Sequence, residues 1–268
     1  PNPAALKALT TTQLNALSST QTSSLSTAQI AALTTQQINN LPTANTSTLT
    51  TAQIVALGSA QVAALTSAQI NSLPSAQLQS ISTVGISIIS NANIALLTTT
   101  AISNLSTAQV QALSSSQFAN LTTDDIAALT SSQYGALTTK QIIGLDASRV
   151  LTLFGGATVS TKIASIPPNA LTKLTSTNTT SLTSAQLAAL TTAQIPGLSA
   201  SVLGSLTTTS TGQIKGLTTA QVASLTQAQA KALSASQLAA LTTTQTAALS
   251  TYALASLTAS AVPSLQVA

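Results

Sequence analysis

The chain contains no cysteine, histidine, methionine, tryptophan or glutamate, and its acidic residues are limited to three aspartates. Without cysteine there are neither disulfides nor thiol chemistry. Nucleophilic catalysis needs a base beside the nucleophile, and the chain has no histidine to act as that base for its many serines. The usual metal ligands are nearly missing as well. We therefore expect no catalytic, cofactor-binding or metal site, and we do not expect the chain to be an enzyme.

Two aspartates are adjacent, Asp124 and Asp125 in "LTTDDIAAL". Paired carboxylates can carry out acid–base hydrolysis. Here they fall in the first turn of an expected helix, where negative charge is favourable. We interpret them as helix-start residues.

Charge is scarce, which limits the partners. The net charge is +4 and the calculated pI is about 9.8, but phosphate binding needs a clustered basic patch. No two cations are adjacent in the sequence, so we expect no nucleic-acid binding. The seven cations are Lys7, Lys140, Arg149, Lys162, Lys173, Lys215 and Lys231.

Long apolar runs are also lacking. Ser, Thr and Gln interrupt every apolar stretch well before it reaches the length of a membrane span, so none is expected despite a mean hydropathy of +0.41. Disorder requires few large aliphatic residues, whereas Leu or Ile recurs here at nearly every eighth position. A regular core is therefore available.

The dominant feature is an eight-residue repeat, the octad, as in "LTTAQIVAL" from Leu49 to Leu57. Counting the large aliphatic residue as position one, the octads run unbroken from Leu9 to Leu153, resume from Ile166 to Leu206, and resume again from Leu217 to Leu265. Position two is Ser or Thr in 24 of the 29 octads, and position five is Gln in 18. Position six is usually Ile, Val or Leu.

Positions two and five read Ser/Thr-x-x-Gln, which is a capping box that starts a helix. Positions one and six then form the apolar pair of a hydrophobic staple. The next cap follows eight residues later, so each helix has about six residues and is unstable alone. The sequence therefore predicts an all-α repeat solenoid of very short capped helices, one per octad. Positions one and six are expected inside, and Thr, Ser and Gln are expected to face water or neighbouring subunits.

Two other folds compete with this one. In one continuous helix the leucine stripe would drift by about 80° per octad, so no face would stay apolar. A β-solenoid or cross-β fibre is the stronger alternative, because Thr, Ile and Val favour strands and low charge suits stacking. Positions one and six would, however, point to opposite faces of a strand.

Interruptions of the phase set the expected domains. Residues 154–168, "FGGATVSTKIASIPP", contain Gly–Gly and Pro–Pro. We predict one solenoid segment over 1–153, an interrupting loop or hinge over 154–165, and a second segment over 166–268 with a small insertion near 207–211.

Some octads within these segments are irregular. Pro42 and Pro74 stand at cap positions, where Thr43 and Ser75 are the alternative caps. The strand-like stretch from Val84 to Ile89 is interpreted as a degenerate octad, with a lateral contact site as the alternative.

The stretches "LSTAQIAALTTQQI" (Leu25 to Ile38) and "LTSAQLAALTTAQI" (Leu182 to Ile195) resemble the octapeptide arrays of large secreted or surface adhesin-like proteins of Gram-negative bacteria. That resemblance implies an extracellular or cell-surface location and a structural or adhesive role, and it supplies no functional residues.

We therefore expect a structural subunit of an extracellular filament, sheath or stalk that associates with itself. The first and last octads carry no charged cap, and contacts that do not close give filaments. The alternative is a surface binding module that binds glycans or ice, or carries O-linked sugars, through its rows of Thr.

Overall fold

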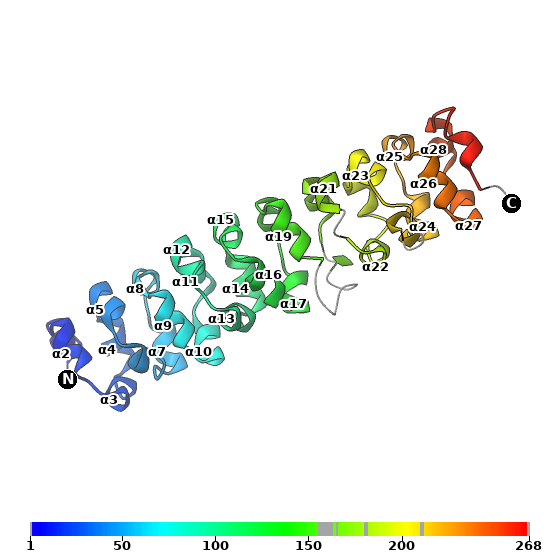
Figure 1. Ribbon diagram of the computed structural model, residues 1–268. Coiled ribbons are helices and arrows are strands. Elements are labelled where there is room, and N and C mark those ends of the chain that lie inside the picture. Colours follow the sequence, from blue (N-terminus) through cyan, green and yellow to red (C-terminus); the bar gives the residue numbers. More distant parts are fainter. Residues whose placement is uncertain (1, 155–162, 165, 180–181, 210–211, 267–268) are drawn as a thin grey trace. The chain divides into compact units, whose positions relative to one another are not determined.

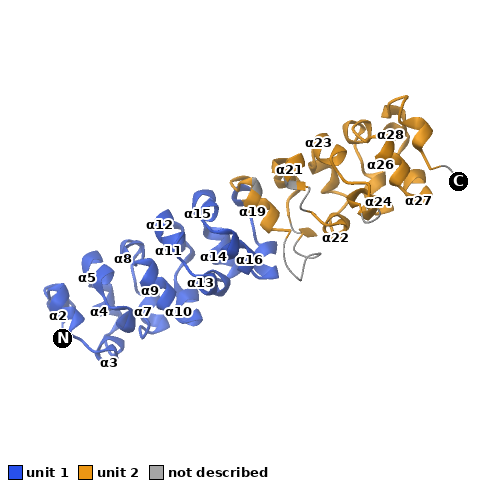
Figure 2. Cartoon of the chain, viewed as in Figure 1, with its two compact units in different colours: residues 1–141 blue, residues 142–268 orange. Residues whose placement is uncertain are grey.

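The computed structural model describes residues 2–154, 163–164, 166–179, 182–209 and 212–266 (Figure 1). The described residues form short helices and connections, with no strand among them. The all-α solenoid prediction is thus confirmed, and the β-solenoid or cross-β alternative is wrong. The chain divides into two compact units, residues 1–141 and 142–268 (Figure 2).

The helices of the first unit have four to six residues each. In chain order they are α1 (Pro3–Lys7), α2 (Thr11–Asn15), α3 (Ser19–Ser23), α4 (Thr27–Ala31), α5 (Thr35–Asn40), α6 (Thr43–Thr46), α7 (Thr51–Val55), α8 (Ser59–Ala64), α9 (Ser67–Ser72), α10 (Ser75–Ser80), α11 (Thr83–Ile88), α12 (Asn91–Ile94), α13 (Thr99–Asn104), α14 (Thr107–Ala112), α15 (Ser115–Ala119), α16 (Thr123–Ala128) and α17 (Ser131–Gly135).

The next helix, α18 (Thr139–Ile143), includes residues of both units. The second unit mixes α-helices with 3₁₀ helices, which are labelled η. In chain order they are α19 (Ala147–Thr152), η1 (Pro168–Lys173), α21 (Ser176–Thr179), α22 (Ser184–Ala188), η2 (Ile195–Gly197), α23 (Ala200–Gly204), η3 (Gln213–Gly216), α24 (Thr219–Ala223), α25 (Gln227–Lys231), α26 (Ala235–Ala240), α27 (Thr243–Ala247), α28 (Thr251–Ser256) and η4 (Val262–Ser264).

Helix α7 illustrates how each octad starts its helix. The side-chain hydroxyl of Thr50 accepts a hydrogen bond from the backbone N–H of Gln53 at 3.2 Å. The Oε1 atom of Gln53 accepts one in return from the backbone N–H of Thr50 at 2.7 Å. Two of the backbone donors that every helix start leaves unpaired are satisfied in this way. The capping-box register predicted from the sequence is therefore confirmed.

Because only position two caps, Thr50→Ala should lower the free energy of unfolding by about 1 kcal/mol, the usual cost of losing an N-cap. Thr51→Ala should cost less, since Thr51 is the first residue of α7 and is exposed. Chemical denaturation of the two variants measures the difference, and equal losses would contradict the register.

Three octads make one turn of the solenoid. Each helix packs against the third helix along the chain, so α5 contacts α8, α8 contacts α11, and α4 contacts α7 (Figure 1). In the second unit the same rule pairs η1 with η2, α22 with η3, and α25 with α28. Helices of this length persist because stacked neighbours bury their apolar side. The repeating unit of the fold is therefore three octads, although that of the sequence is one.

The core is built from positions one and six, as predicted. Leu49 and Ile54 are both 1% exposed, and the corresponding Leu and Ile of most octads are buried to a similar degree. The two largest rings at position six, Phe118 and Tyr134, are also inside, at 0% and 2% exposure. The strand-like stretch folds as α11, which leaves Val84 and Ile88 exposed on its surface.

Prolines at cap positions do not stop the helices. Helices α6 and α10 begin directly after Pro42 and Pro74, with no side-chain cap. The alternative caps, Thr43 and Ser75, are instead the first helical residues. Pro168 likewise begins η1. The first N–H groups of a helix have no intrahelical partner, so a proline there removes little.

The predicted hinge lies mostly outside the described residues. Of residues 154–165, the structure describes Phe154, Ile163 and Ala164. Phe154 and Ile163 are fully buried. In the insertion near 207–211, residues 210–211 lie outside the described part, while Thr207 and Gln213 still exchange both capping hydrogen bonds across it.

Candidate functional site: a glutamine clasp between turns

The glutamine at position five joins each turn of the solenoid to the one before. Its Oε1 belongs to the capping box, which leaves the Nε2 group free to donate elsewhere. In Gln69, Nε2 donates to the backbone carbonyls of Ile38 and Leu41, both at 2.7 Å, while Oε1 accepts from the N–H of Thr66 at 2.8 Å. We call this arrangement the glutamine clasp: a position-five Gln bonded to its own N-cap and to two carbonyls one turn earlier.

The clasp recurs with constant spacing. In the first unit its acceptors lie 31 and 28 residues before the glutamine, at position six of the fourth octad before it and position one of the third. Across the 207–211 insertion these separations become 34 and 31, as for Gln221 and its acceptors Leu187 and Leu190. The clasp is kept across the insertion. Its members are Gln37, Gln53, Gln61, Gln69, Gln109, Gln117, Gln133, Gln141, Gln194, Gln213, Gln221, Gln229, Gln237 and Gln245.

The expectation that glutamine faces water or another subunit is wrong for these residues. Gln53, Gln69 and Gln109 are no more than 2% exposed. A buried amide must have its donors and acceptor satisfied, and the clasp satisfies both. One signal could have revealed it: a capping box accepts Glu as readily as Gln, yet the chain contains no glutamate. Only the amide can donate to the carbonyls of the preceding turn.

Shorter side chains make partial clasps. The Nδ2 atom of Asn93 donates to the carbonyl of Leu65, 28 residues earlier, at 2.9 Å. Asn45 reaches Leu17 in the same way, also at 2.9 Å. Asp125 occupies this position too and is 2% exposed. Its Oδ2 accepts from the backbone N–H of Thr122 at 2.9 Å, but this side chain, unlike that of Asn or Gln, has no N–H group to donate to the turn before.

Exchanging the amide and the acid at position five should move stability in opposite directions. Asn93→Asp removes the donor to Leu65 and should lower the free energy of unfolding by roughly 1 to 3 kcal/mol, since a buried acceptor is left unpaired. Asp125→Asn keeps the capping bond, adds a donor toward Leu97, and should raise it by about 1 kcal/mol. Urea denaturation at neutral pH measures both. Changes of the same sign would contradict this role for position five.

A second set of amides bonds in the opposite direction along the solenoid. At position seven, Asn39 donates to the carbonyl of Ala64 at 2.8 Å and Asn71 to that of Leu96 at 3.0 Å, each 25 residues later. The Oδ1 of Asn71 also accepts from the N–H of Thr98, at 2.9 Å. The octad of Thr98 has alanine at position five, so Asn71 supplies the acceptor that the clasp would have provided.

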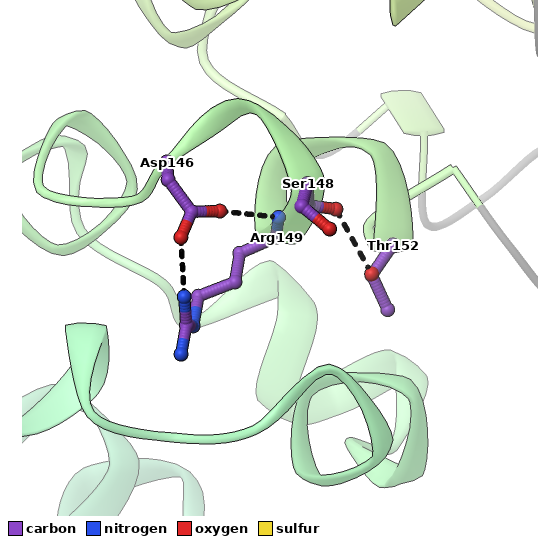
Figure 3. Close-up of polar contacts among 4 residues, drawn as sticks. All are labelled: Asp146, Ser148, Arg149 and Thr152. Atoms are coloured by element: carbon purple, nitrogen blue, oxygen red, sulfur yellow. Dashed lines mark hydrogen bonds and ion pairs between the residues drawn. The ribbon is translucent and has the colours of Figure 1, made fainter.

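The start of α19 carries the charged pair in Figure 3. Asp146 caps the helix by accepting from the backbone N–H of Arg149 at 2.8 Å, and it forms an ion pair with the Arg149 guanidinium (Figure 3). Within the same helix, Thr152 donates to the carbonyl of Ser148 at 3.1 Å. The backbone hydrogen bond, followed by the guanidinium, holds the pKa of Asp146 below its usual value. The pair therefore stabilises the fold above the unfolded-state pKa, and this contribution is lost as the pH falls through the folded one.

The buried phenol of Tyr134 predicts a pH effect of the opposite sign. Burial raises the pKa of Tyr134 to about 12, and its hydroxyl donates to the carbonyl of Ile126 at 2.9 Å. Above pH about 10 the Tyr134 phenol of the unfolded state loses its proton, whereas that of the folded state keeps it. Stability should fall by about 2 to 3 kcal/mol as the pH rises from about 10 to 12.

Tyr134→Phe isolates this effect. At neutral pH the variant should be less stable by about 1 kcal/mol, the net value of one hydrogen bond. At pH about 12 it should be the more stable protein, because it has no buried phenol to ionise. The measurement is the difference in unfolding free energy between the variant and the unmodified chain as a function of pH. A difference that did not change with pH would contradict the raised pKa of Tyr134.

The acidic residues do not gather into a further site. Asp124 and Asp125 both lie in the first turn of α16, as predicted, with Asp124 exposed. Within the described ranges, no three His, Cys, Asp or Glu side chains come together in a way that could hold a metal ion. No helix in that part of the chain is long and apolar enough to cross a membrane.

Comparison with known proteins bears on the repeat. No curated protein matches the chain significantly. Two stretches, residues 43–75 and 86–123, match the ALTTAQ repeat. The letters of that name correspond to position eight of one octad followed by positions one to five of the next, so they include the clasp glutamine. Both stretches are therefore similar to the ALTTAQ repeat, which supports a tandem repeat array.

Proposed function

We propose that the chain is a structural subunit of an extracellular filament, sheath or stalk, built by self-association of its solenoid turns. The glutamine clasp is the observation that carries this proposal. It is the specific polar interaction that recurs from turn to turn, and its acceptors are backbone carbonyls that every octad has. A turn of this kind is built to bind another turn of the same kind.

Low charge supports the same role. Repulsion between copies is weak when the net charge is +4 over 268 residues. Repeat arrays gain stability from each neighbouring interface, so an additional turn stabilises the turn that it covers. The resemblance to octapeptide arrays of secreted and surface proteins favours an extracellular location.

Sedimentation velocity over a range of protein concentrations, with electron microscopy of the same samples, tests this function. We expect the weight-average sedimentation coefficient to increase with concentration and filaments to appear. A monodisperse monomer at the highest concentration would contradict self-association.

One observation favours a second function, a surface binding module. Position-three hydroxyls recur at every third octad, on successive turns, and are exposed, as a row that comprises Thr35, Ser59, Thr83, Thr107 and Ser131. A regular hydroxyl row could bind glycans or ice, or carry O-linked sugars. Thermal hysteresis and glycan-array binding measure these activities. Either one, found in a monomeric protein, would favour this function over the structural one.

A further inference from the structure

The first unit contains a long stretch without charge. No Asp, Glu, Lys, Arg or His stands between Lys7 and Asp124, so residues 8–123 present only hydroxyl, amide and apolar side chains. The structure describes every residue of this stretch. Charged side chains keep protein surfaces soluble and apart, and their absence promotes association. A surface built without them is suited to contact with another uncharged surface.

An exposed apolar face lies within this stretch. The large aliphatic side chains that remain exposed among residues 8–123 are Val55, Val84, Ile88 and Leu96. Only Val84 and Ile88 belong to the same helix, α11, where their spacing of four residues places them on one side. Val84 is 60% and Ile88 39% exposed. Helix α11 therefore presents an aliphatic face to its surroundings.

The neighbouring turns extend this face into a stripe. Helices α8 and α14 both pack against α11 (Figure 1), and each has alanine at the two positions that Val84 and Ile88 occupy. The resulting apolar stripe consists of Ala60, Ala64, Val84, Ile88, Ala108 and Ala112. Polar residues bound it, Gln36 and Asn40 on α5 and Ser132 on α17. An exposed apolar patch with a polar rim is typical of a protein–protein contact.

Helix α11 also lacks the clasp that its neighbours have. Gly85 stands at its position five, so no side chain reaches the preceding turn from there. Gln61 of α8 and Gln109 of α14 both donate to the turn before them. A contact on the outer face of α11 would supply stabilisation at the helix of this row that has no clasp.

The occupant that fits the stripe is the same stripe of a second copy. A partner with charged groups would lose their hydration on contact, and residues 8–123 have no charge to pair with them. A lipid surface recruits proteins through basic residues beside the apolar ones, and this stretch has none. The stripe of another copy is uncharged, apolar and of the same extent. Two-fold contacts join identical patches in this way.

We therefore propose that two copies of the chain pair side by side, with the Val84–Ile88 face of one copy against that of the other. The inference rests on the proposed self-association and adds a lateral contact to it. Burial of the two faces removes aliphatic groups from water, which drives the pairing. Such a contact is isologous and closes as a pair. It joins two solenoids laterally and does not lengthen either one.

Cysteine cross-linking tests the pairing directly, because the chain has no cysteine of its own. Ile88→Cys places one thiol on the stripe of each copy, and a short bismaleimide should link two copies into a dimer. Val55→Cys is the matched control, since Val55 is 68% exposed in the same uncharged stretch but lies on α7, outside the stripe. Pairing raises the effective concentration of the thiols at position 88, so the yield there should be at least about tenfold higher than at position 55. Equal yields would overturn the pairing.

A charge on the stripe should remove the link. Val84→Lys, added to the Ile88→Cys chain, brings two like charges together in the contact, and the dimer yield should fall at least about tenfold. Lysine is a good helix former, so α11 keeps its fold. Val55→Lys adds the same charge outside the stripe and should leave the yield unchanged. Circular dichroism checks that both variants keep their helical content, and an equal effect of the two lysines would contradict the assignment.

The outcomes separate lateral pairing from the function on which it rests. A sedimentation coefficient that increases with concentration, without a dimer linked at position 88, would overturn the pairing and leave self-association in place. A linked dimer that never extends would support the pairing and contradict the filament. Flotation with uncharged phosphatidylcholine vesicles tests the lipid surface. Vesicle binding that Val84→Lys removes, without a linked dimer, would overturn the pairing in favour of lipid.

Discussion

Replacing Gln69 by leucine is expected to lower the free energy of unfolding by about 3 kcal/mol or more. The substitution removes one of the two hydrogen bonds to the carbonyl of Ile38, which still accepts from the N–H of Leu41 at 3.2 Å. It leaves two backbone groups unpaired: the N–H of Thr66 and the carbonyl of Leu41. Each costs roughly 1 to 3 kcal/mol, and the apolar contacts of leucine offset only part of this. Denaturant unfolding followed by circular dichroism measures the loss.

The next octad along the chain provides the matched control. Gln77 also stands at position five, but its cap residue is Pro74, which has no N–H to donate to Oε1. Gln77 is half-exposed and forms no hydrogen bond among the described residues. Gln77→Leu should therefore change the stability by no more than about 0.5 kcal/mol, as surface substitutions usually do. Equal losses for Gln69→Leu and Gln77→Leu would mean that the clasp does not hold the turns together.

Gly197→Ala should also be strongly destabilising. Gly197 ends η2, which packs against η1 one turn earlier. A Cβ atom at this position would lie 2.1 Å from the carbonyl oxygen of Pro168 and 2.9 Å from its carbon. Both are backbone atoms, so the two 3₁₀ helices must move apart. We expect a loss of about 3 kcal/mol, at the upper end of the usual cost of overpacking.

Gly135→Ala is the matched control for that substitution. A Cβ atom on Gly135, the last residue of α17, meets nothing within 4 Å. Alanine is the better helix former, so this variant should gain roughly 0.5 to 1 kcal/mol. Thermal or chemical denaturation of both variants gives the comparison. A loss for Gly135→Ala as large as that for Gly197→Ala would contradict the close approach of η1 and η2.

The start of each helix could be predicted from the sequence because its cause is local. The capping box depends on residues three apart, such as Thr50 and Gln53, and the repeat shows that spacing again and again. Burial of positions one and six follows from the same register. The lengths of the helices follow from the distance between successive caps.

The number of octads per turn could not be predicted in this way. An eight-residue period is the same whether two, three or four octads close a turn, because the choice depends on how side chains meet across turns. That information lies in the second function of Gln69, whose Nε2 reaches Ile38 and Leu41 far away in the sequence. The capping box alone accounts for a glutamine at this position, so the local pattern does not require a buried donor. Only the absence of glutamate distinguishes the two functions.

Close contacts between backbone segments of successive turns could not be predicted from the sequence either. Nothing in the sequence around Gly197 differs from a glycine at a helix end, and its contact with Pro168 depends on the path of the chain one turn earlier. The prolines at cap positions weaken the helices less than the sequence suggests, for a related reason. A proline at the cap has no N–H to donate to the position-five glutamine, as at Gln77, so it affects the clasp. It removes no hydrogen bond within the helix.

The central claim is that three octads form one turn, and spin labels test it most directly. The chain has no cysteine, so cysteine pairs introduced for labelling have no competitor. Thr83, Asn91, Thr99 and Thr107 all occupy position three and are exposed. Pairing Thr83→Cys in turn with Asn91→Cys, Thr99→Cys and Thr107→Cys gives separations of one, two and three octads. Electron paramagnetic resonance should give the shortest distance for Thr83 with Thr107, because α11 packs against α14 at the roughly 8 to 10 Å typical of helix neighbours. A shorter distance for either of the other pairs would contradict the three-octad turn.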